Sequence, residues 1–218
     1  MTASSEINGV VLAGGHSSRM GRDKAALIFQ GQTLLGRAKR ALRPICQAVF
    51  VSVRKDQRIP REFEPDRVVR DAFGLAGALG GIASVLATQP NHAWLVLACD
   101  LPHVEPELLQ ELLANRDPAS DATAFVSDNG RTEALCTLYE PSALEKLQQR
   151  IETGLFDLGP AMDCLHVRRL RLLNADWLRS VKNQEQYETA FNQQMQTPNP
   201  FFGSAAHEQL RGRFPQVG

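Results

Sequence analysis

The stretch Val10–Lys24, VVLAGGHSSRMGRDK, decides the fold expected for this 218-residue chain. Its apolar start predicts the end of a buried strand, and the chain then passes directly into a loop of small, polar and cationic residues. Gly14 and Gly15 lack a Cβ, so their backbone can bring consecutive N–H groups close to an anion, while Arg19 and Lys24 add positive charge. The stretch therefore predicts a strand followed by a phosphate-binding loop.

Two better-known phosphate-binding loops do not fit these residues. A P-loop requires Gly-x-x-x-x-Gly-Lys-Ser/Thr, whereas here Lys24 lies three residues after Gly21 and is followed by Ala25, which has no hydroxyl for Mg²⁺. A dinucleotide-binding loop requires Gly-x-Gly-x-x-Gly, and the tripeptide Gly14-Gly15-His16 breaks that spacing. The loop therefore belongs to neither class.

The loop closely resembles the Leu-Ala-Gly-Gly-x-Ser-x-Arg-Met-Gly-x-Asp-Lys signature of the molybdenum cofactor guanylyltransferases, which belong to a wider nucleotidyltransferase superfamily. The signature runs without insertion from Leu12 to Lys24. The resemblance implies a three-layer, Rossmann-like α/β nucleotidyltransferase fold whose central sheet is mostly parallel with an antiparallel edge. It also implies that the nucleotide phosphates bind over the loop, at Leu12, Ala13, Gly14, Gly15, Ser17, Arg19 and Lys24.

Length and composition fit one α/β domain with a tail. The chain is 43% hydrophobic and 22% charged, which suffices for a layered core over residues 1–194. From Met195 the composition shifts to Gln, Asn, Pro and Gly, so residues 195–218 are expected to form a weakly ordered polar tail. The formal net charge is zero, which argues against nucleic acid or a membrane surface as the main partner.

Cysteine spacing and the absence of long apolar runs indicate a cytoplasmic protein with neither a zinc site nor disulfides. The four cysteines, at positions 46, 99, 136 and 164, make no Cys-x-x-Cys pair and predict neither a zinc site nor a disulfide framework. The first residues lack the basic region of a signal peptide, and no stretch approaches the length of a membrane span.

Apolar periodicity predicts alternating strands and helices, and therefore a parallel sheet. Strands are expected at 7–12, 48–53, 68–69, 93–99, 121–127, 135–139 and 167–173, with 135–139 antiparallel at an edge. Helices are expected at 34–45, 82–89, 105–115, 142–152, 156–164 and 184–194, with a short hairpin at 25–32 before the first. Thr33 is the expected N-cap of that first helix, whose basic residues Arg37, Lys39, Arg40 and Arg43 are expected to face solvent. Residues 72–81, with four glycines, are expected to form a second flexible loop.

Asp100 is the expected magnesium ligand. It follows the most apolar predicted strand, and the carboxyl end of such a strand is where open α/β sheets bind ligands. Mg²⁺ in triphosphate enzymes is held by one or two carboxylates together with the phosphates. The segment LACDLP at 97–102 also resembles the metal-binding motif of the family.

Three further contacts to the nucleotide are implied by the resemblance. Asp71 lies at a position where the family has an aspartate that contacts the nucleotide, and Ser52 lies where it often has an asparagine. The segment GALGG at 77–81, which ends at Gly81, is similar to the family's Gly-Pro-Leu-x-Gly segment, with Ala78 in place of the proline. The residue types alone leave a simpler role open for Asp71, that of a turn residue.

Taken with these residues, the resemblance implies a Mg²⁺-dependent transfer of GMP from GTP to molybdopterin, with Arg19 and Lys24 neutralising phosphate charge beside Asp100. Transient contacts with proteins of molybdenum cofactor biosynthesis, or with acceptor proteins, are also expected. The resemblance weakens after Pro102, and Ser180 and Lys182 replace two family asparagines on the acceptor or metal side of the site. Two alternatives stay open. The first is a nucleotidyltransferase that transfers CMP or that uses another phosphorylated metabolite as acceptor. The second is a nucleotide-binding module without catalysis.

Overall fold

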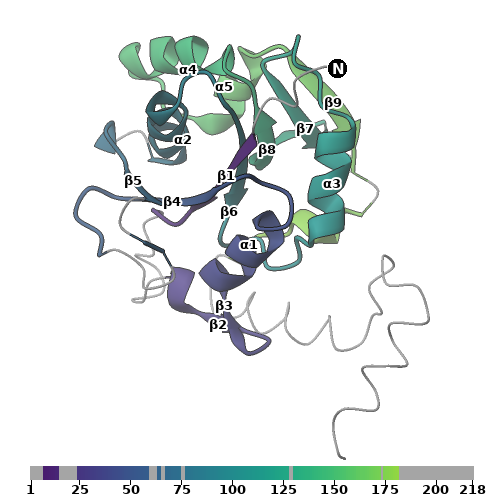
Figure 1. The fold of residues 1–218 in the computed structure, drawn as a ribbon. Helices are drawn as coiled ribbons and strands as arrows, with labels where there is room; N and C mark the ends of the chain where they lie inside the picture. Colours follow the sequence, from purple (N-terminus) through teal and green to yellow (C-terminus); the bar gives the residue numbers. More distant parts are fainter. Residues whose placement is uncertain are drawn as a thin grey trace, which may run out of the picture. The chain divides into compact units, whose positions relative to one another are not determined.

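The computed structural model describes residues 7–14, 24–58, 63–64, 67–74, 77–127, 130–172 and 174–181 (Figure 1). Residues Met1–Ser180 form one compact unit. The helix predicted at 184–194 and the tail predicted at 195–218 belong to a second unit, Val181–Gly218, and lie outside the described residues. The domain boundary at residue 194 therefore stays a prediction.

A seven-stranded sheet with the order β5-β4-β1-β6-β8-β7-β9 forms the centre of the first unit. Its strands are β1 (Ile7–Leu12), β4 (Val49–Val53), β5 (Val68–Arg70), β6 (Ala93–Ala98), β7 (Ala122–Val126), β8 (Thr132–Tyr139) and β9 (Val167–Arg171). The strands β5, β4, β1 and β6 are parallel, β8 is antiparallel to both of its neighbours, and β9 is parallel to β7. The mostly parallel sheet with an antiparallel part is confirmed. The antiparallel strand predicted at 135–139 is β8, and it lies inside the sheet because β7 and β9 pair beyond it.

Helices cover both faces of this sheet, which confirms the expected three layers (Figure 1). Residues of α1 (Leu34–Leu42) and α3 (Pro106–Ala114) pack into one core cluster. Residues of α2 (Gly77–Thr88), α4 (Ala143–Glu152) and α5 (Leu158–Asp163) pack into the other. Neighbouring residues of β1 alternate between the clusters, Val10 facing α2 and Val11 facing α1, as the two-residue period of a strand requires.

The hairpin predicted before the first helix is confirmed as β2 (Ile28–Phe29) paired with β3 (Gln32–Thr33). A short 3-10 turn, Lys24–Ala26, precedes it. Thr33 caps α1 as predicted, because its hydroxyl accepts a hydrogen bond from the Gly36 N–H at 2.9 Å. The cap fixes where α1 begins, and therefore how its first turn approaches the sheet.

Two local predictions were wrong. Arg37 was expected to face solvent, but it is only 7% exposed and its guanidinium is held by buried acceptors, which replace the water that it loses. The flexible loop expected at 72–81 is also shorter than predicted, because α2 begins at Gly77 and contains Gly80 and Gly81. A Cβ on Gly81 would lie 3.2 Å from the Ser52 hydroxyl oxygen, so this glycine permits close helix–sheet packing.

The structure can be compared with the predictions about cysteines, metal sites and membrane spans within the residues that it describes. All four cysteines, which lie in that part of the chain, have free thiols. No group of three or more His, Cys, Asp or Glu side chains with the arrangement of a metal site occurs among the described residues. None of the helices in the described ranges is long and apolar enough to cross a membrane.

Candidate active site

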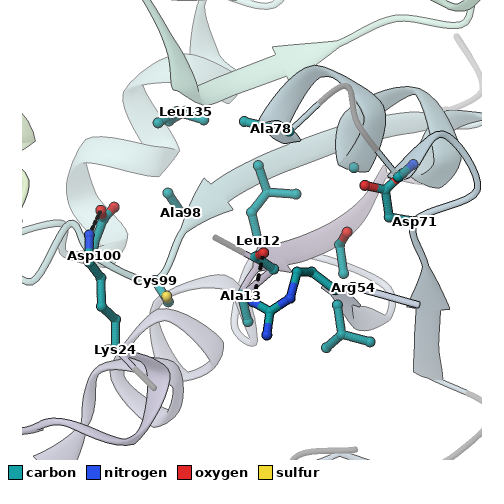
Figure 2. Close-up of a pocket in the computed structure, with 16 residues that line it drawn as sticks. Leu12, Ala13, Lys24, Arg54, Asp71, Ala78, Ala98, Cys99, Asp100 and Leu135 are labelled. Atoms are coloured by element: carbon teal, nitrogen blue, oxygen red, sulfur yellow. Dashed lines mark hydrogen bonds and ion pairs between the residues drawn. The ribbon is translucent and has the colours of Figure 1, made fainter. Parts of the chain in front are cut away.

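One pocket of the described structure, which we call the main pocket, lies at the carboxyl ends of β1, β4 and β6, the edge where open α/β sheets bind ligands (Figure 2). Its cavity volume is about 160 Å³. It is lined by residues Leu12, Ala13, Gly14, Lys24, Ser52, Val53, Arg54, Asp71, Gly74, Gly77, Ala78, Gly81, Ala98, Cys99, Asp100 and Leu135. The parallel register brings these distant segments together, since Leu12 pairs with both Ser52 and Ala98.

Most of the residues predicted to bind the nucleotide line this pocket. They are Leu12, Ala13, Gly14, Lys24, Ser52, Asp71, Gly81 and Asp100. Three others, Gly15, Ser17 and Arg19, lie outside the described residues. Side chains and backbone from six segments of the chain therefore converge at one place, while the individual role of each stays a prediction.

Lys24 and Asp100 form an ion pair in the wall of the pocket, with 3.6 Å between Lys24 Nζ and Asp100 Oδ2 (Figure 2). Both side chains are 21% exposed, so each is partly accessible from the pocket. Lys24 comes from the 3-10 turn before the hairpin, and Asp100 follows the end of β6. The pair places a cation and a hard oxygen ligand within reach of one phosphate chain.

Asp71 combines a turn role with a place in the pocket. Its Oδ1 accepts hydrogen bonds from the N–H groups of Phe73 at 2.8 Å and Gly74 at 3.1 Å, and from the Ser84 hydroxyl at 3.4 Å. All three hydrogen bonds are accepted by the same carboxylate oxygen. The turn role is present in the structure, and the same carboxylate lines the pocket.

Arg54, Gln57 and Arg70 support the start of the predicted phosphate loop, and the sequence did not reveal this role. Gln57 Nε2 donates to the Ala13 carbonyl at 3.2 Å, and Arg54 Nη1 donates to the Gly14 carbonyl at 3.1 Å. Arg70 Nη1 lies within 3.2 Å of the carbonyl oxygens of residues 54, 55 and 57 and so holds the turn that carries both donors. We call Arg54, Gln57 and Arg70 the loop brace.

The loop brace sets the direction of a backbone donor. In a trans peptide the C=O and N–H point in opposite directions. Because Gln57 binds the Ala13 carbonyl, the Gly14 N–H of the same peptide points away from Gln57. Gly14 lines the pocket and Gln57 does not. A side chain at Gly14 would crowd the brace, because a Cβ there would lie 3.3 Å from the Arg54 backbone nitrogen. The one sequence feature that could have indicated the brace is a cation directly after β4, at the same sheet edge as Asp71.

Arg37 stabilises the segment that follows Asp100. Its guanidinium donates to the Pro102 carbonyl from Nε at 3.2 Å and from Nη2 at 3.0 Å, and Nη2 also lies 2.8 Å from Glu105 Oε1. Burial lowers the pKa of Arg37, and burial also raises the pKa of Glu105, although each group partly offsets the shift of the other. Helix α1 is thereby connected to the backbone that positions the predicted metal ligand.

Comparisons with known proteins agree with this architecture. The family model described as MobA-like NTP transferase domain matches residues 9–162. A probable molybdenum cofactor guanylyltransferase of Chloroflexus aggregans is 35% identical over 165 residues, which are 73% of this chain and 78% of that protein. The molybdenum cofactor guanylyltransferase of Pseudomonas putida KT2440 is 33% identical over 156 residues, 70% of this chain and 80% of that one.

Two further comparisons concern a longer relative and a solved structure of lower sequence identity. The molybdenum cofactor biosynthesis bifunctional protein of Synechocystis is 34% identical over 67% of this chain, and the match spans 43% of that longer protein. The crystal structure of molybdopterin-guanine dinucleotide biosynthesis protein A from Archaeoglobus fulgidus matches with a TM-score of 0.74, covering 87% of this chain and all of that one. At 20% identity that likeness supports the fold. The chain therefore belongs to the MobA-like NTP transferase family and is a nucleotidyltransferase.

Proposed function

We propose that this protein transfers GMP from GTP to molybdopterin, with Mg²⁺ as cofactor and pyrophosphate as leaving group. The observation that carries the proposal is the Lys24–Asp100 pair in the wall of a pocket at the carboxyl edge of the sheet. The relatives named molybdenum cofactor guanylyltransferase supply the substrate class. Binding of GTP, of Mg²⁺ and of molybdopterin are each part of the proposal.

In the proposed reaction a phosphate oxygen of the acceptor attacks the α-phosphorus of GTP. The new P–O bond forms as the bond between the α-phosphorus and the bridging oxygen breaks, and that oxygen leaves with pyrophosphate. A phosphomonoester is already an anion at neutral pH, so the attacking oxygen needs no general base. The work of the protein is then positioning and charge neutralisation.

Residues of the chain divide this work. Lys24 would neutralise charge on the phosphates, and the Gly14 N–H, oriented by the loop brace, would donate to a phosphate oxygen. Asp100 fits a Mg²⁺ ion through its carboxylate, a hard oxygen ligand that the pocket exposes. A magnesium ion bound there would supply positive charge to the phosphate oxygens. Asp71 and Ser52 would face the nucleoside, because they line the pocket on its β4, β5 and α2 side.

Calorimetry with GTP, CTP, ATP and UTP in the presence of Mg²⁺ tests this proposal. We expect GTP to bind most tightly, and Lys24→Gln and Asp100→Asn each to weaken GTP binding about 10-fold or more, the size of one lost charged contact. Lys55→Gln is the control, because Lys55 is an exposed lysine outside the pocket lining.

A second assay measures pyrophosphate released on addition of molybdopterin. Release by the wild type, and its loss in Asp100→Asn, is the expected result. If CTP binds most tightly, the base in the proposed function changes from guanine to cytosine, and the proposed nucleotidyl transfer is retained. Nucleotide binding without pyrophosphate release would instead favour a binding module.

A further inference from the structure

A second pocket, wide open to solvent, lies beside β9 and is lined by two arginines of that strand. Its volume is about 480 Å³, and its lining consists of Val126, Ser127, Gly130, Arg169, Leu170 and Arg171. The side chains of Arg169 and Arg171 are exposed. Neither of them makes a hydrogen bond or ion pair to another residue of the described ranges. We call this site the arginine cavity.

The strand register places both arginines on one face of the sheet. Arg169 pairs with Ala124 and Arg171 with Val126, and Ala124 belongs to the core cluster shared by α2, α4 and α5. Val167, which alternation puts on the same face, packs against that cluster, whereas Arg169 and Arg171 continue beyond the covered area. Arg168 is exposed on the opposite face of β9.

The arginine cavity lies at the same edge of the sheet as the main pocket. Both β6 and β7 are antiparallel to β8, so β6, β7 and β9 all present their carboxyl ends there. The start of β8 lies between the two sites, because Leu135 lines the main pocket and Gly130, just before β8, lines the arginine cavity. Three strand spacings separate β6 from β9, which is roughly 14 Å.

We infer that Arg169 and Arg171 bind an anionic group of the acceptor other than its reacting phosphate. The inference rests on the proposed function, because the main pocket is then filled by the nucleotide and the acceptor phosphate. An elongated phosphomonoester that enters beside Asp100 and follows the sheet edge across β8 reaches the two guanidinium groups. Guanidinium forks are suited to oxyanions, which they bind through paired N–H groups.

Protection of an open sheet edge is the simpler explanation for charges on β9. That explanation applies equally to the three exposed arginines of the strand, Arg168, Arg169 and Arg171. A binding site instead separates them, because Arg169 and Arg171 line the cavity and Arg168 does not. Arg168 is therefore a matched control on the same strand.

The experiment compares the double variant Arg169→Gln/Arg171→Gln with Arg168→Gln and with the charge-preserving Arg169→Lys/Arg171→Lys. Binding of molybdopterin is measured directly by its fluorescence without nucleotide, and GTP binding is measured separately by calorimetry. We expect the glutamine double variant to bind molybdopterin about 10-fold or more weakly, the Lys variant to retain part of the affinity, and Arg168→Gln to be unchanged. GTP affinity should stay within about 2-fold in all three variants, which also shows that they are folded.

Each outcome decides a separate claim. Equal molybdopterin affinity in the wild type and the glutamine double variant overturns the arginine cavity as an acceptor site and leaves the proposed transfer intact. The same loss in Arg168→Gln also overturns it, because the effect is then general surface charge. No molybdopterin binding by the wild type overturns the inference and the acceptor together, whereas failure of GTP alone to bind overturns only the proposed nucleotide.

Discussion

At the scale of single residues, Arg37 shows how much a buried charge depends on its partners. The side chains of Arg37 and Glu105 are 8% and 18% exposed, and the same guanidinium also binds the Pro102 carbonyl. In Arg37→Met the Glu105 carboxylate stays buried without its cation, and we expect the free energy of unfolding at pH 8 to fall by about 3 kcal/mol. Urea unfolding monitored by circular dichroism measures the change.

The pH dependence of that loss gives an internal control. Burial already raises the pKa of Glu105 in the folded protein, and removal of Arg37 raises it further. A carboxyl group whose folded pKa exceeds its unfolded value contributes stability at low pH, which is lost as the pH rises through the folded pKa. The destabilisation by Arg37→Met should therefore be smaller at pH 4.5 than at pH 8. An equal loss of unfolding free energy at pH 4.5 and pH 8 would show that Arg37→Met destabilises the protein through altered packing and not through the lost charge.

At the scale of elements, the turn between β4 and β5 positions the loop that follows β1. Arg70 holds that turn by its carbonyls, and Gln57 and Arg54 connect the turn to Ala13 and Gly14. We expect Arg70→Gln to weaken GTP binding about 3- to 10-fold, since each hydrogen bond contributes about 0.5–1.5 kcal/mol, and to leave guanosine binding unchanged. Calorimetry with both ligands checks this, with Arg67→Gln, directly before the same strand, as control. A parallel loss of guanosine binding would indicate general damage to the pocket.

Elements with a strong local pattern were the ones that could be predicted from sequence. The buried run of β6, the capped start of α1 and the proline in the first turn of α3 each carry their own signal. The start of α2 could not be predicted, because glycine disfavours helices and the close contact of Gly81 with β4 exists only in the folded sheet. The burial of Arg37 depends likewise on Pro102 and Glu105, which are distant in sequence.

At the scale of the whole molecule, the candidate site could be predicted in outline because one edge of a parallel sheet collects its parts. Asp100 follows β6, Asp71 follows β5, and Lys24 ends the sequence motif that follows β1. The carboxyl ends of these parallel strands lie at one edge of the sheet, so motif and topology lead to the same place. The brace residues and the arginine cavity could not be predicted, since Arg54 and Arg70 follow the strands predicted at 48–53 and 68–69, and Arg169 lies within the strand predicted at 167–173, with no motif that names a partner. Their roles depend on strand order, which a single sequence does not specify.

Residues 195–218 follow the part of the chain in which the structure describes the fold and the site. The family match ends at residue 162, and both core clusters and all pocket residues of the described structure lie before residue 180. We therefore expect a chain shortened after residue 194 to keep its free energy of unfolding within ~0.5 kcal/mol, as for changes outside a core, and to keep its GTP affinity. Urea unfolding and calorimetry on the shortened and full chains measure both quantities. Weaker GTP binding at unchanged stability would assign the tail to the nucleotide site, and lower stability would assign it to the core.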